Sequence, residues 1–354
     1  MQLKRVHEKN YAAPPLGVYI HWPYCRKKCP YCDFNSHVTD AIDTDTWLKA
    51  FDRALTEKAD ILAERTLETV FFGGGTPSLM PVHIVDAVLA SIEKLSGQTP
   101  GEVTLEANPT SVESSNFKAL AKAGVNRLSM GVQALNDDDL HFLGREHTAA
   151  EALAALEIAR SCFNRVSFDL IYARPGQNTK TWSDELKQAL SLDCDHHSLY
   201  QLTIEPQTPF FMMARRGDFT IPDDEQAADL YLMTEDLMRD GGFHAYEISN
   251  YARPGFECRH NLIYWRGEEY LGIGPGAHGR IYSDGKWLAT RQHRSPDIWL
   301  EKTLNRDGAE TQEWLSDHQR LEERIMLGLR MEQGVELTTL ARDFGHENVQ
   351  EALN

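Results

Sequence analysis

The chain has 354 residues, a formal net charge of −17 and an ordinary hydrophobic content of 42%. This length allows one large domain with a smaller one attached, and no apolar run approaches the length of a membrane-spanning helix. Acidic residues outnumber basic ones by 53 to 36, which argues against broad binding to a nucleic-acid backbone. Residues 1–10 are polar and lack the apolar segment of a secretory signal, so the sequence predicts a cytoplasmic protein.

Short β-rich runs alternate with helical patterns over the first two thirds of the chain. The predicted strands are 17–21, 69–72, 103–107, 127–132, 165–171 and 198–202. The predicted helices between them are 45–65, 82–95, 114–123, 149–162 and 181–192. Repeated strand–helix units predict an α/β fold with a parallel sheet and right-handed crossovers. Six such units fit a partly open barrel, with a doubly wound sheet as the alternative.

Polar or glycine-rich residues follow the end of each predicted strand, which favours the barrel. A glycine run at 73–77 follows the second strand, and Glu106, Gln133 and Asp169 lie at the ends of the next three. The carboxyl ends of barrel strands converge on one face, so these residues are expected to form one rim. The glycine run lets backbone approach a ligand closely, and it lacks the Lys-Ser/Thr pair of a phosphate loop. Each polar residue also fits a purely structural role as a hydrogen-bonding group.

Three cysteines directly follow the first predicted strand. Cys25, Cys29 and Cys32 have the spacing Cys-x3-Cys-x2-Cys. Three thiolates this close can hold three corners of a cubane [4Fe–4S] cluster and leave the fourth iron open to a ligand. A structural zinc site, with His21 or His37 as its fourth ligand, is the alternative. A disulfide framework is not expected from six cysteines in this long chain, and the other three are expected to be reduced.

The ordered motifs of the chain resemble radical S-adenosylmethionine proteins, and more closely the oxygen-independent coproporphyrinogen III oxidase-like group. The segments that carry this resemblance are 19–24 with the three cysteines, 73–77, 106–109, 131–133, 143–145 and 169–172. Within that group the chain is similar to the HemW type, the haem chaperones. Phe34 stands where the oxidases have a fourth cysteine, and 260–265 match the His-Asn-x-x-Tyr-Trp motif associated with haem.

The resemblance implies a partial (β/α)6 TIM-like barrel followed by a small, mostly helical, winged-helix-like domain. The expected domains are 1–290, with a haem-motif extension at about 243–282, and 291–354. Helical patterns at 321–331 and 337–344 fit the second domain, which is expected to be shorter than in the family. The implied cofactors are a [4Fe–4S] cluster on the three cysteines, S-adenosylmethionine and haem.

The resemblance assigns the methionine end of S-adenosylmethionine to residues of three motifs. Gly74, Gly75 and Thr76 are expected at the methionine amino group or the nearby backbone. Glu106 is expected to anchor the same end of the molecule. Arg145 is expected to pair with the methionine carboxylate, because a guanidinium fork suits a carboxylate.

The remaining implied residues surround the ribose and the cluster. Gln133 and Asp169 are expected to hydrogen-bond the ribose hydroxyls, since an amide and a carboxylate are natural partners of a diol. Tyr19 and Phe34 are expected to line the cofactor pocket. Phe34 is also expected to shield the cluster, together with Tyr31.

The implied haem residues are His260, Asn261, Tyr264 and Trp265. Neutral imidazole is a good axial ligand of haem iron, and the two aromatic side chains could pack on the porphyrin. Cys258 and His278 are further candidate ligands, and His260 also fits a structural, hydrogen-bonded role.

The resemblance implies a haem chaperone that passes haem to an acceptor protein and receives electrons from a donor, without a nucleic-acid partner or a membrane span. The alternative is an enzyme that oxidatively decarboxylates coproporphyrinogen III. The radical core could in principle cleave S-adenosylmethionine, but the missing fourth cysteine favours the chaperone.

Overall fold

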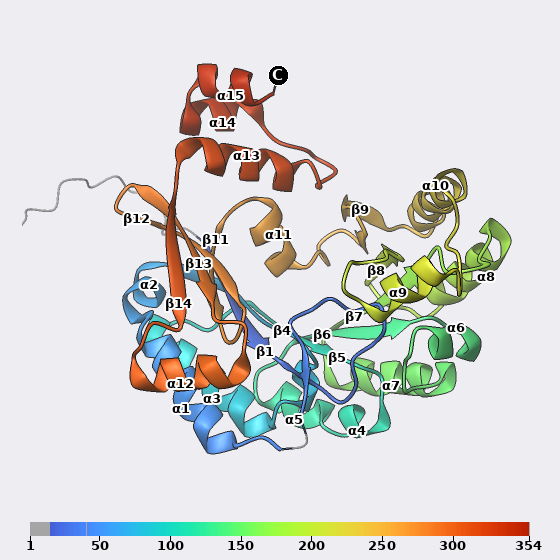
Figure 1. Ribbon diagram of the computed structural model, residues 1–354, viewed down its shortest axis with the longest axis horizontal. Coiled ribbons are helices and arrows are strands. Elements are labelled where there is room, and N and C mark those ends of the chain that lie inside the picture. Colours follow the sequence, from blue (N-terminus) through green and yellow to red (C-terminus); the bar gives the residue numbers. More distant parts are fainter. Residues whose placement is uncertain (1–14, 40, 354) are drawn as a thin grey trace, which may run out of the picture.

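The computed structural model describes residues 15–39 and 41–353. The segment 1–10, from which the sequence predicts no secretory signal, lies outside the described residues. Six parallel neighbouring strands form the centre of a larger sheet (Figure 1). They are β1 (Pro15–Trp22), β4 (Thr66–Gly74), β5 (Glu102–Ala107), β6 (Arg127–Gln133), β7 (Arg165–Tyr172) and β8 (His196–Gln201). These are the six predicted strands, and they follow one another across the sheet in chain order.

Helices connect these strands along one side of the sheet (Figure 1). They are α1 (Thr44–Thr56), α2 (Ala59–Glu64), α3 (Val82–Ser96), α4 (Ser111–Ser114), α5 (Phe117–Lys122), α6 (Asp137–Phe142), α7 (Ala149–Cys162) and α8 (Thr179–Leu190). The predicted helices 45–65 and 114–123 are each divided in two. The start of α7 shows the local signal: Thr148 Oγ1 accepts a hydrogen bond from the Glu151 amide, and Glu151 Oε2 accepts one from the Thr148 amide.

The alternation of side chains along β1 separates the core from the interior of the barrel. Leu16, Val18 and Ile20 are fully buried in a core that also contains Trp47 of α1. Gly17, Tyr19 and His21 lie on the opposite face, since successive residues of a strand alternate between its two faces. The barrel interior is therefore available for polar and ligand-binding groups.

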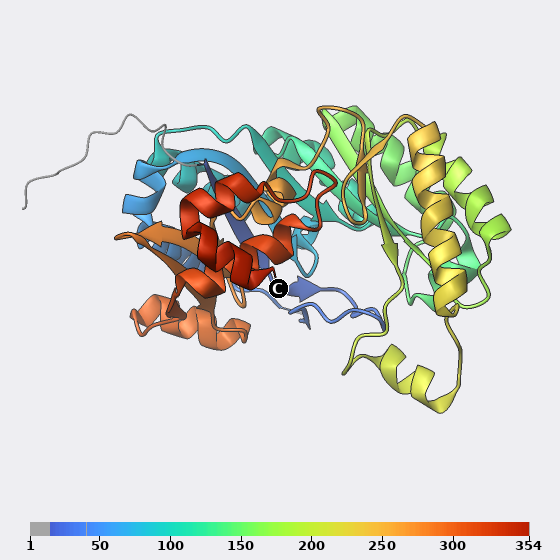
Figure 2. The ribbon, with the colours of Figure 1, turned by 90° about the horizontal axis from the view of Figure 1, so that it is seen from above.

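Both edges of the sheet are extended by elements that the sequence did not predict. On one edge, β11 (Glu269–Ile273) lies parallel to β1 and is followed by antiparallel β12 (His278–Ser283), β13 (Lys286–Gln292) and β14 (Glu310–Leu315). On the other edge lie β10 (Asn250–Ala252) and β9 (His244–Glu247). A small separate sheet pairs β2 (Tyr24–Cys25) with β3 (His37–Val38). The helices of these regions are α9 (Pro209–Arg216), α10 (Asp224–Asp240), α11 (Arg259–Trp265) and α12 (Pro296–Asn305), with α9 projecting from the body in Figure 2.

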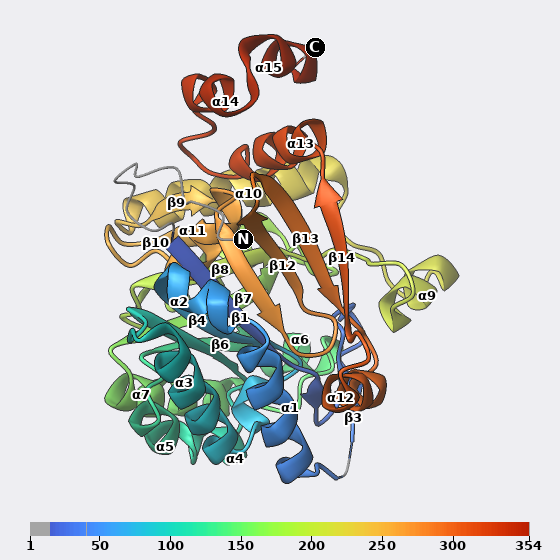
Figure 3. The same ribbon diagram turned by 90° about the vertical axis from the view of Figure 1, so that its left-hand side faces the viewer.

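A helical cap, defined as α13 (Asp317–Gly328), α14 (Leu337–Phe344) and α15 (His346–Ala352), completes the chain. It has its own small core of Leu321, Leu340 and Val349, and it lies beyond the end of β13 and β14 in Figure 3. The predicted pattern 337–344 coincides with α14. The predicted boundary at 291 falls in β13, and β13 and β14, with α12 between them, belong to the large sheet region that precedes the cap at Asp317. Among the described residues, no helix is both long enough and apolar enough to cross a membrane.

Candidate functional site

The loop that carries the three cysteines is held at the carboxyl end of β1 by close backbone contacts. The Gly75 amide donates to Trp22 O over 2.7 Å, and a Cβ at Gly75 would lie only 2.7 Å from Tyr24 O. A Cβ at Gly144, whose φ is +70°, would lie 2.6 Å from Pro30 Cδ. Glycine at these two positions therefore allows the neighbouring strand-end loops to approach the cysteine loop from two sides.

Two of the three thiols accept hydrogen bonds from residues at other strand ends. Thr76 Oγ1 donates to Cys25 Sγ over 3.3 Å, and Arg145 Nη1 donates to Cys29 Sγ over 3.4 Å. Burial raises the pKa of the Cys25 and Cys32 thiols, and the neighbouring thiols raise it further. The cysteine loop is thus connected to two other loops through its sulfur atoms.

All three cysteines line one cavity of about 460 Å³, here called the cluster cavity. Its volume lies in the range of roughly 300–1,000 Å³ that is typical of ligand sites. The predicted residues that line it are Cys25, Cys29, Cys32, Phe34, Gly75, Thr76, Glu106, Gln133, Arg145 and Asp169. The structure therefore brings together residues from the ends of most of the parallel strands, as the barrel prediction requires.

Asn108 is a residue of the cluster cavity that the sequence analysis did not single out. Its side-chain amide donates to Thr76 Oγ1 over 3.2 Å, and its Oδ1 accepts a hydrogen bond from Arg145 Nη2. Asn108 thereby connects two residues that each donate to a cysteine sulfur. Its place in the segment 106–109, two residues after Glu106 at the end of β5, was the signal that could have identified it.

Arg145 makes several hydrogen bonds in the cluster cavity, and one of its nitrogens has no acceptor among the described residues. Its Nη2 donates to Gly131 O over 2.8 Å, but its buried Nε has no acceptor among the described residues.

Gln133 enters the cavity from the end of β6, where its φ of +75° accompanies an irregularity in the pairing with β7. Such a backbone is costly for a residue other than glycine and is found mainly at functional positions.

The carboxyl groups of Glu106 and Asp169 line the cluster cavity, and both residues are half-buried. Burial, with a contribution from Asp169, raises the pKa of Glu106 to about 8. Burial raises the pKa of Asp169 to about 6, although Ser198, Arg127 and Arg145 favour its charged form. Glu106 is therefore largely protonated at neutral pH in the absence of a cationic partner.

His21 is not free to act as the fourth ligand of a zinc site. Its Nε2 donates to Asn35 O over 3.0 Å, and its Nδ1 lies 3.0 Å from Tyr19 OH. Within residues 15–39 and 41–353, no group of three or more His, Cys, Asp or Glu side chains has the arrangement of a single-ion metal site.

A second cavity of about 520 Å³, here called the aromatic cavity, adjoins the first and shares Phe34 and Glu106 with it. Tyr19 and Gly74, which the resemblance placed at S-adenosylmethionine, line this second cavity. Most of its other residues come from α11, β11, β12 and α13. They include Tyr264, Trp265, Tyr270, His278, Arg280, Arg320, Glu323 and Met326.

His260 lines neither cavity. It is buried, its Nδ1 lies 2.7 Å from Thr69 Oγ1, and its Nε2 lies 2.7 Å from Tyr264 OH. Its ring stacks on Phe71 with centroids 5.0 Å apart, and burial lowers its pKa to about 3. Its arrangement is that of a structural residue, and its role as a haem ligand stays a prediction.

The other candidates around His260 are also outside the cavities. Asn261 Nδ2 donates to Tyr246 OH over 3.5 Å. Cys258 is buried, and its thiol donates to Glu102 Oε1, while burial raises its pKa to about 12. Of the four predicted haem residues, the structure brings only Tyr264 and Trp265 to a cavity.

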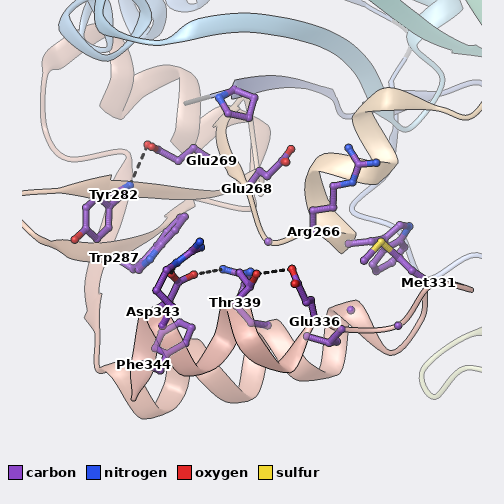
Figure 4. Close-up of a pocket in the computed structure, with 18 of the residues that line it drawn as sticks. Arg266, Glu268, Glu269, Tyr282, Trp287, Met331, Glu336, Thr339, Asp343 and Phe344 are labelled. Carbon is purple, nitrogen blue, oxygen red and sulfur yellow. Dashed lines mark hydrogen bonds and ion pairs between the residues drawn. The ribbon is translucent and has the colours of Figure 1, made fainter. Parts of the chain in front are cut away.

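A third cavity of about 990 Å³ lies between the helical cap and the barrel. Figure 4 shows Glu268, Glu269 and Arg266 facing it from one side, with Asp343 of α14 and Glu336, directly before α14, on the other. Charged groups thus dominate this cavity, in contrast to the aromatic cavity.

A partly open parallel barrel with three cysteines in its first strand-end loop defines a radical S-adenosylmethionine protein. The family model of the radical SAM superfamily matches residues 19–189. The chain is 40% identical over 331 residues to radical S-adenosyl methionine domain-containing protein 1, mitochondrial, of Danio rerio, covering 91% of this chain and 74% of that protein. It is 35% identical over 333 residues to heme chaperone HemW of Bacillus subtilis, covering 93% and 87%.

The chain belongs to the radical SAM superfamily and, within it, to the family that contains these two proteins. The structure of the coproporphyrinogen III oxidase HemN from Escherichia coli, described there as a radical SAM enzyme, has the same fold. The two chains superpose with a TM-score of 0.78 at 22% identity, covering 94% of this chain and 80% of that one. The predicted family and fold are confirmed.

This family uses a [4Fe–4S] cluster and S-adenosylmethionine, and the residues of the cluster cavity fit both. The three thiols that line the cavity supply three cluster ligands, and the guanidinium group of Arg145 in the same lining suits an anionic ligand group.

Proposed function

We propose that this protein is a haem chaperone that binds haem, holds a [4Fe–4S] cluster with S-adenosylmethionine, and delivers the haem to an acceptor protein. Five relatives named heme chaperone HemW are 35–42% identical to the chain. The structural observation that carries the proposal is the pair of adjoining cavities. One contains the three thiols together with Glu106, Arg145 and Asp169, and the other is lined by aromatic side chains and is large enough for a ligand.

In this proposal the cluster cavity binds S-adenosylmethionine through groups of opposite charge. Cys25, Cys29 and Cys32 hold the cluster, which supplies an electron for reductive cleavage of the sulfonium. Arg145 binds the methionine carboxylate, because its guanidinium group lines the cavity beside Cys29, to whose sulfur its Nη1 donates. Glu106 receives the methionine ammonium and becomes ionised as it does so.

The same cavity contains partners for the ribose. Gln133 at the end of β6 and Asp169 on the neighbouring strand β7 both line the cavity that contains the three cysteines. A carboxylate accepts two hydroxyl hydrogen bonds, and an amide both donates and accepts. Gly75 and Thr76 complete the wall next to Cys25, where Thr76 already donates to the sulfur.

An electron donor is proposed to approach the cysteine loop directly. Arg26, Lys27 and Lys28 are exposed between Cys25 and Cys29, and two of these three side chains line the cluster cavity. Three consecutive cations are unusual on a chain of net charge −17 and would attract an acidic donor.

Anaerobic reconstitution with iron and sulfide, followed by titration with ferric haem, tests this function. We expect saturable haem binding to the reconstituted protein and transfer of the bound haem to a haem-free globin used as a probe acceptor. A protein that binds no haem would overturn the proposal. Conversion of coproporphyrinogen III to protoporphyrinogen IX by the reconstituted protein would instead establish an oxidase.

A further inference from the structure

The aromatic cavity presents one imidazole that is available to a metal ion. Two histidines line it, His21 and His278. His21 uses both ring nitrogens in hydrogen bonds to Tyr19 and Asn35. His278, the first residue of β12, is exposed, and no hydrogen bond joins its ring to another residue in the described part of the chain.

We infer that haem binds in the aromatic cavity with His278 as an axial ligand of its iron. This inference rests on the proposed function, because it assigns the site of the haem that the chaperone would carry. It assigns the ligand role to a residue outside the His-Asn-x-x-Tyr-Trp segment. That segment then contributes walls to the site through Tyr264 and Trp265, and His260 supports these walls from the core.

The walls of the cavity suit a flat aromatic ligand. Tyr264 and Tyr270 meet edge to face, with ring centroids 4.6 Å apart and an interplanar angle of 83°. The cavity of about 520 Å³ lies within the usual range of ligand sites, roughly 300–1,000 Å³. Trp265 also lines it and adds a third large aromatic side chain.

The charges around the cavity suit the two propionates of haem. Arg280 and Arg320 both line the cavity, and both form ion pairs with the same carboxylate, Glu323. Two guanidinium groups that share one carboxylate leave a net positive charge, and guanidinium groups bind carboxylates well. Glu106, the other acid of the lining, adds little negative charge: burial raises its pKa to about 8 in the ligand-free protein, and the methionine ammonium would neutralise it when S-adenosylmethionine is bound.

The third cavity is a poorer site for the same ligand, although it is larger. Its lining contains five carboxylic acids, Glu268, Glu269, Asp317, Glu336 and Asp343, against three arginines, Arg266, Arg324 and Arg342 (Figure 4). This balance repels a dianionic ligand. Among the described residues, that lining contains no histidine or cysteine. The side chains in it that can ligate haem iron are Met331 and Tyr282.

The position of His278 agrees with a ligand role, because it is the first residue of β12, lines the cavity and has no ring hydrogen bond to another described residue. Because His278 is exposed at the edge of the cavity, a haem bound to it could be transferred to another protein without opening the core.

His260 is a positioning residue in this arrangement. Its Nε2 fixes Tyr264 OH, and its stacking on Phe71 connects α11 to β4. Replacement of His260 would therefore disturb the wall of the haem site and weaken binding, without removing a ligand from the iron. Loss of haem binding in a His260 variant alone does not distinguish these roles, whereas the spectrum of the haem that remains bound does.

The test is a ferric-haem titration of the cluster-reconstituted protein, with electron paramagnetic resonance and magnetic circular dichroism of the bound haem. The variants are His278→Ala, His260→Ala and a matched control, His318→Ala. His318 is an exposed histidine on α13 that pairs with Glu322 and lines neither the aromatic nor the third cavity. The oxidised cluster is diamagnetic, so the ferric haem signal can be measured separately.

We expect His278→Ala to weaken haem binding by at least about tenfold and to remove the histidine-ligated signature, since even groups that only support a metal site contribute roughly 10- to 100-fold. Added imidazole should restore this signature in His278→Ala. His318→Ala should bind haem as the wild type does, and the haem retained by His260→Ala should keep the histidine-ligated signature.

The propionate contacts are tested with haem dimethyl ester as a second probe. The wild type should bind the ester more weakly than haem, and Arg280→Gln should reduce this difference. Wild-type affinity and an unchanged signature in His278→Ala would overturn the inference and leave the proposed function intact. A wild type that binds no haem would overturn the proposed function itself.

Discussion

The cysteine loop and helix α11 both carry motifs that predict ligands, but the two regions place their side chains differently. The cysteine loop leaves the sheet at the carboxyl end of β1, and its three thiols line a cavity. Helix α11 packs against β1, β4 and β11, and its residues His260 and Ile263 are buried. A motif residue at a strand end is free to bind a ligand, whereas one on the packed face of a helix has to satisfy its polar atoms within the protein.

The largest expected effect is the loss of cluster iron when a cysteine of the loop is replaced. Cys29→Ala should remove nearly all cluster iron and acid-labile sulfide, because three protein ligands leave none to spare. Iron and sulfide analysis of anaerobically purified protein measures this. Cys162→Ala is the matched control, since Cys162 is a free, half-buried thiol on α7 and does not line the cluster cavity. Equal iron in the wild type and Cys29→Ala would remove the cysteine loop from the cluster site.

On the helix side, His260→Ala should mainly lower the free energy of unfolding. The variant loses a buried ring, which costs about 3–5 kcal/mol for aromatic residues, and leaves Thr69 and Tyr264 without a partner. Exposed His278→Ala should change stability by no more than about 0.5 kcal/mol. Urea unfolding of both variants measures the difference. Equal stability of the two variants would contradict the structural role of His260.

The same comparison explains which parts of the site could be predicted from the sequence. Strands and helices with regular patterns predicted the barrel, and the strand-end positions of Glu106, Gln133 and Asp169 predicted a shared cavity. The order of the strands along the chain is sufficient to predict this cavity, because successive parallel strands bring their carboxyl ends to one face.

The aromatic cavity could not be predicted in this way. Its lining combines β1 near the start of the chain with α11, β12 and α13 near its end. The contact depends on β11 pairing with β1 and on α13 reaching β12, where Arg280 pairs with Glu323. Pairings between such distant segments leave no local pattern in one sequence, and the short strands at the sheet edges have only weak signals.

A smaller effect, on the affinity for S-adenosylmethionine, is expected when Arg145 is replaced. Arg145→Ala should weaken S-adenosylmethionine binding by about 10- to 100-fold, since a hydrogen bond to a charged group contributes about 1.5–3 kcal/mol. Isothermal titration of the reconstituted protein measures this affinity. Arg26→Ala is a matched control on the exposed part of the cysteine loop. Unchanged affinity in Arg145→Ala would remove its proposed role at the carboxylate.

The smallest expected effect is a pH dependence that arises from Glu106. The pKa of Glu106 is about 8 in the folded protein and near 4.5 when unperturbed, so the folded state binds more protons between these values. Stability of the ligand-free protein should therefore fall as pH rises through this window. Binding of the S-adenosylmethionine ammonium should show the opposite trend, because it requires the carboxylate and expels the proton.

The affinity for S-adenosylmethionine should accordingly rise between about pH 6.5 and pH 8, by at most about tenfold per pH unit, and level off above this range. This range lies above the pKa of Asp169, which is about 6, so Asp169 remains mostly ionised throughout. Glu106→Gln preserves the shape of the side chain and should abolish both trends. If Glu106→Gln kept the rise in affinity, the titrating group would have to lie elsewhere. Glu106 would then serve only to accept the Gly74 amide, which the side-chain carbonyl of the glutamine variant could also do.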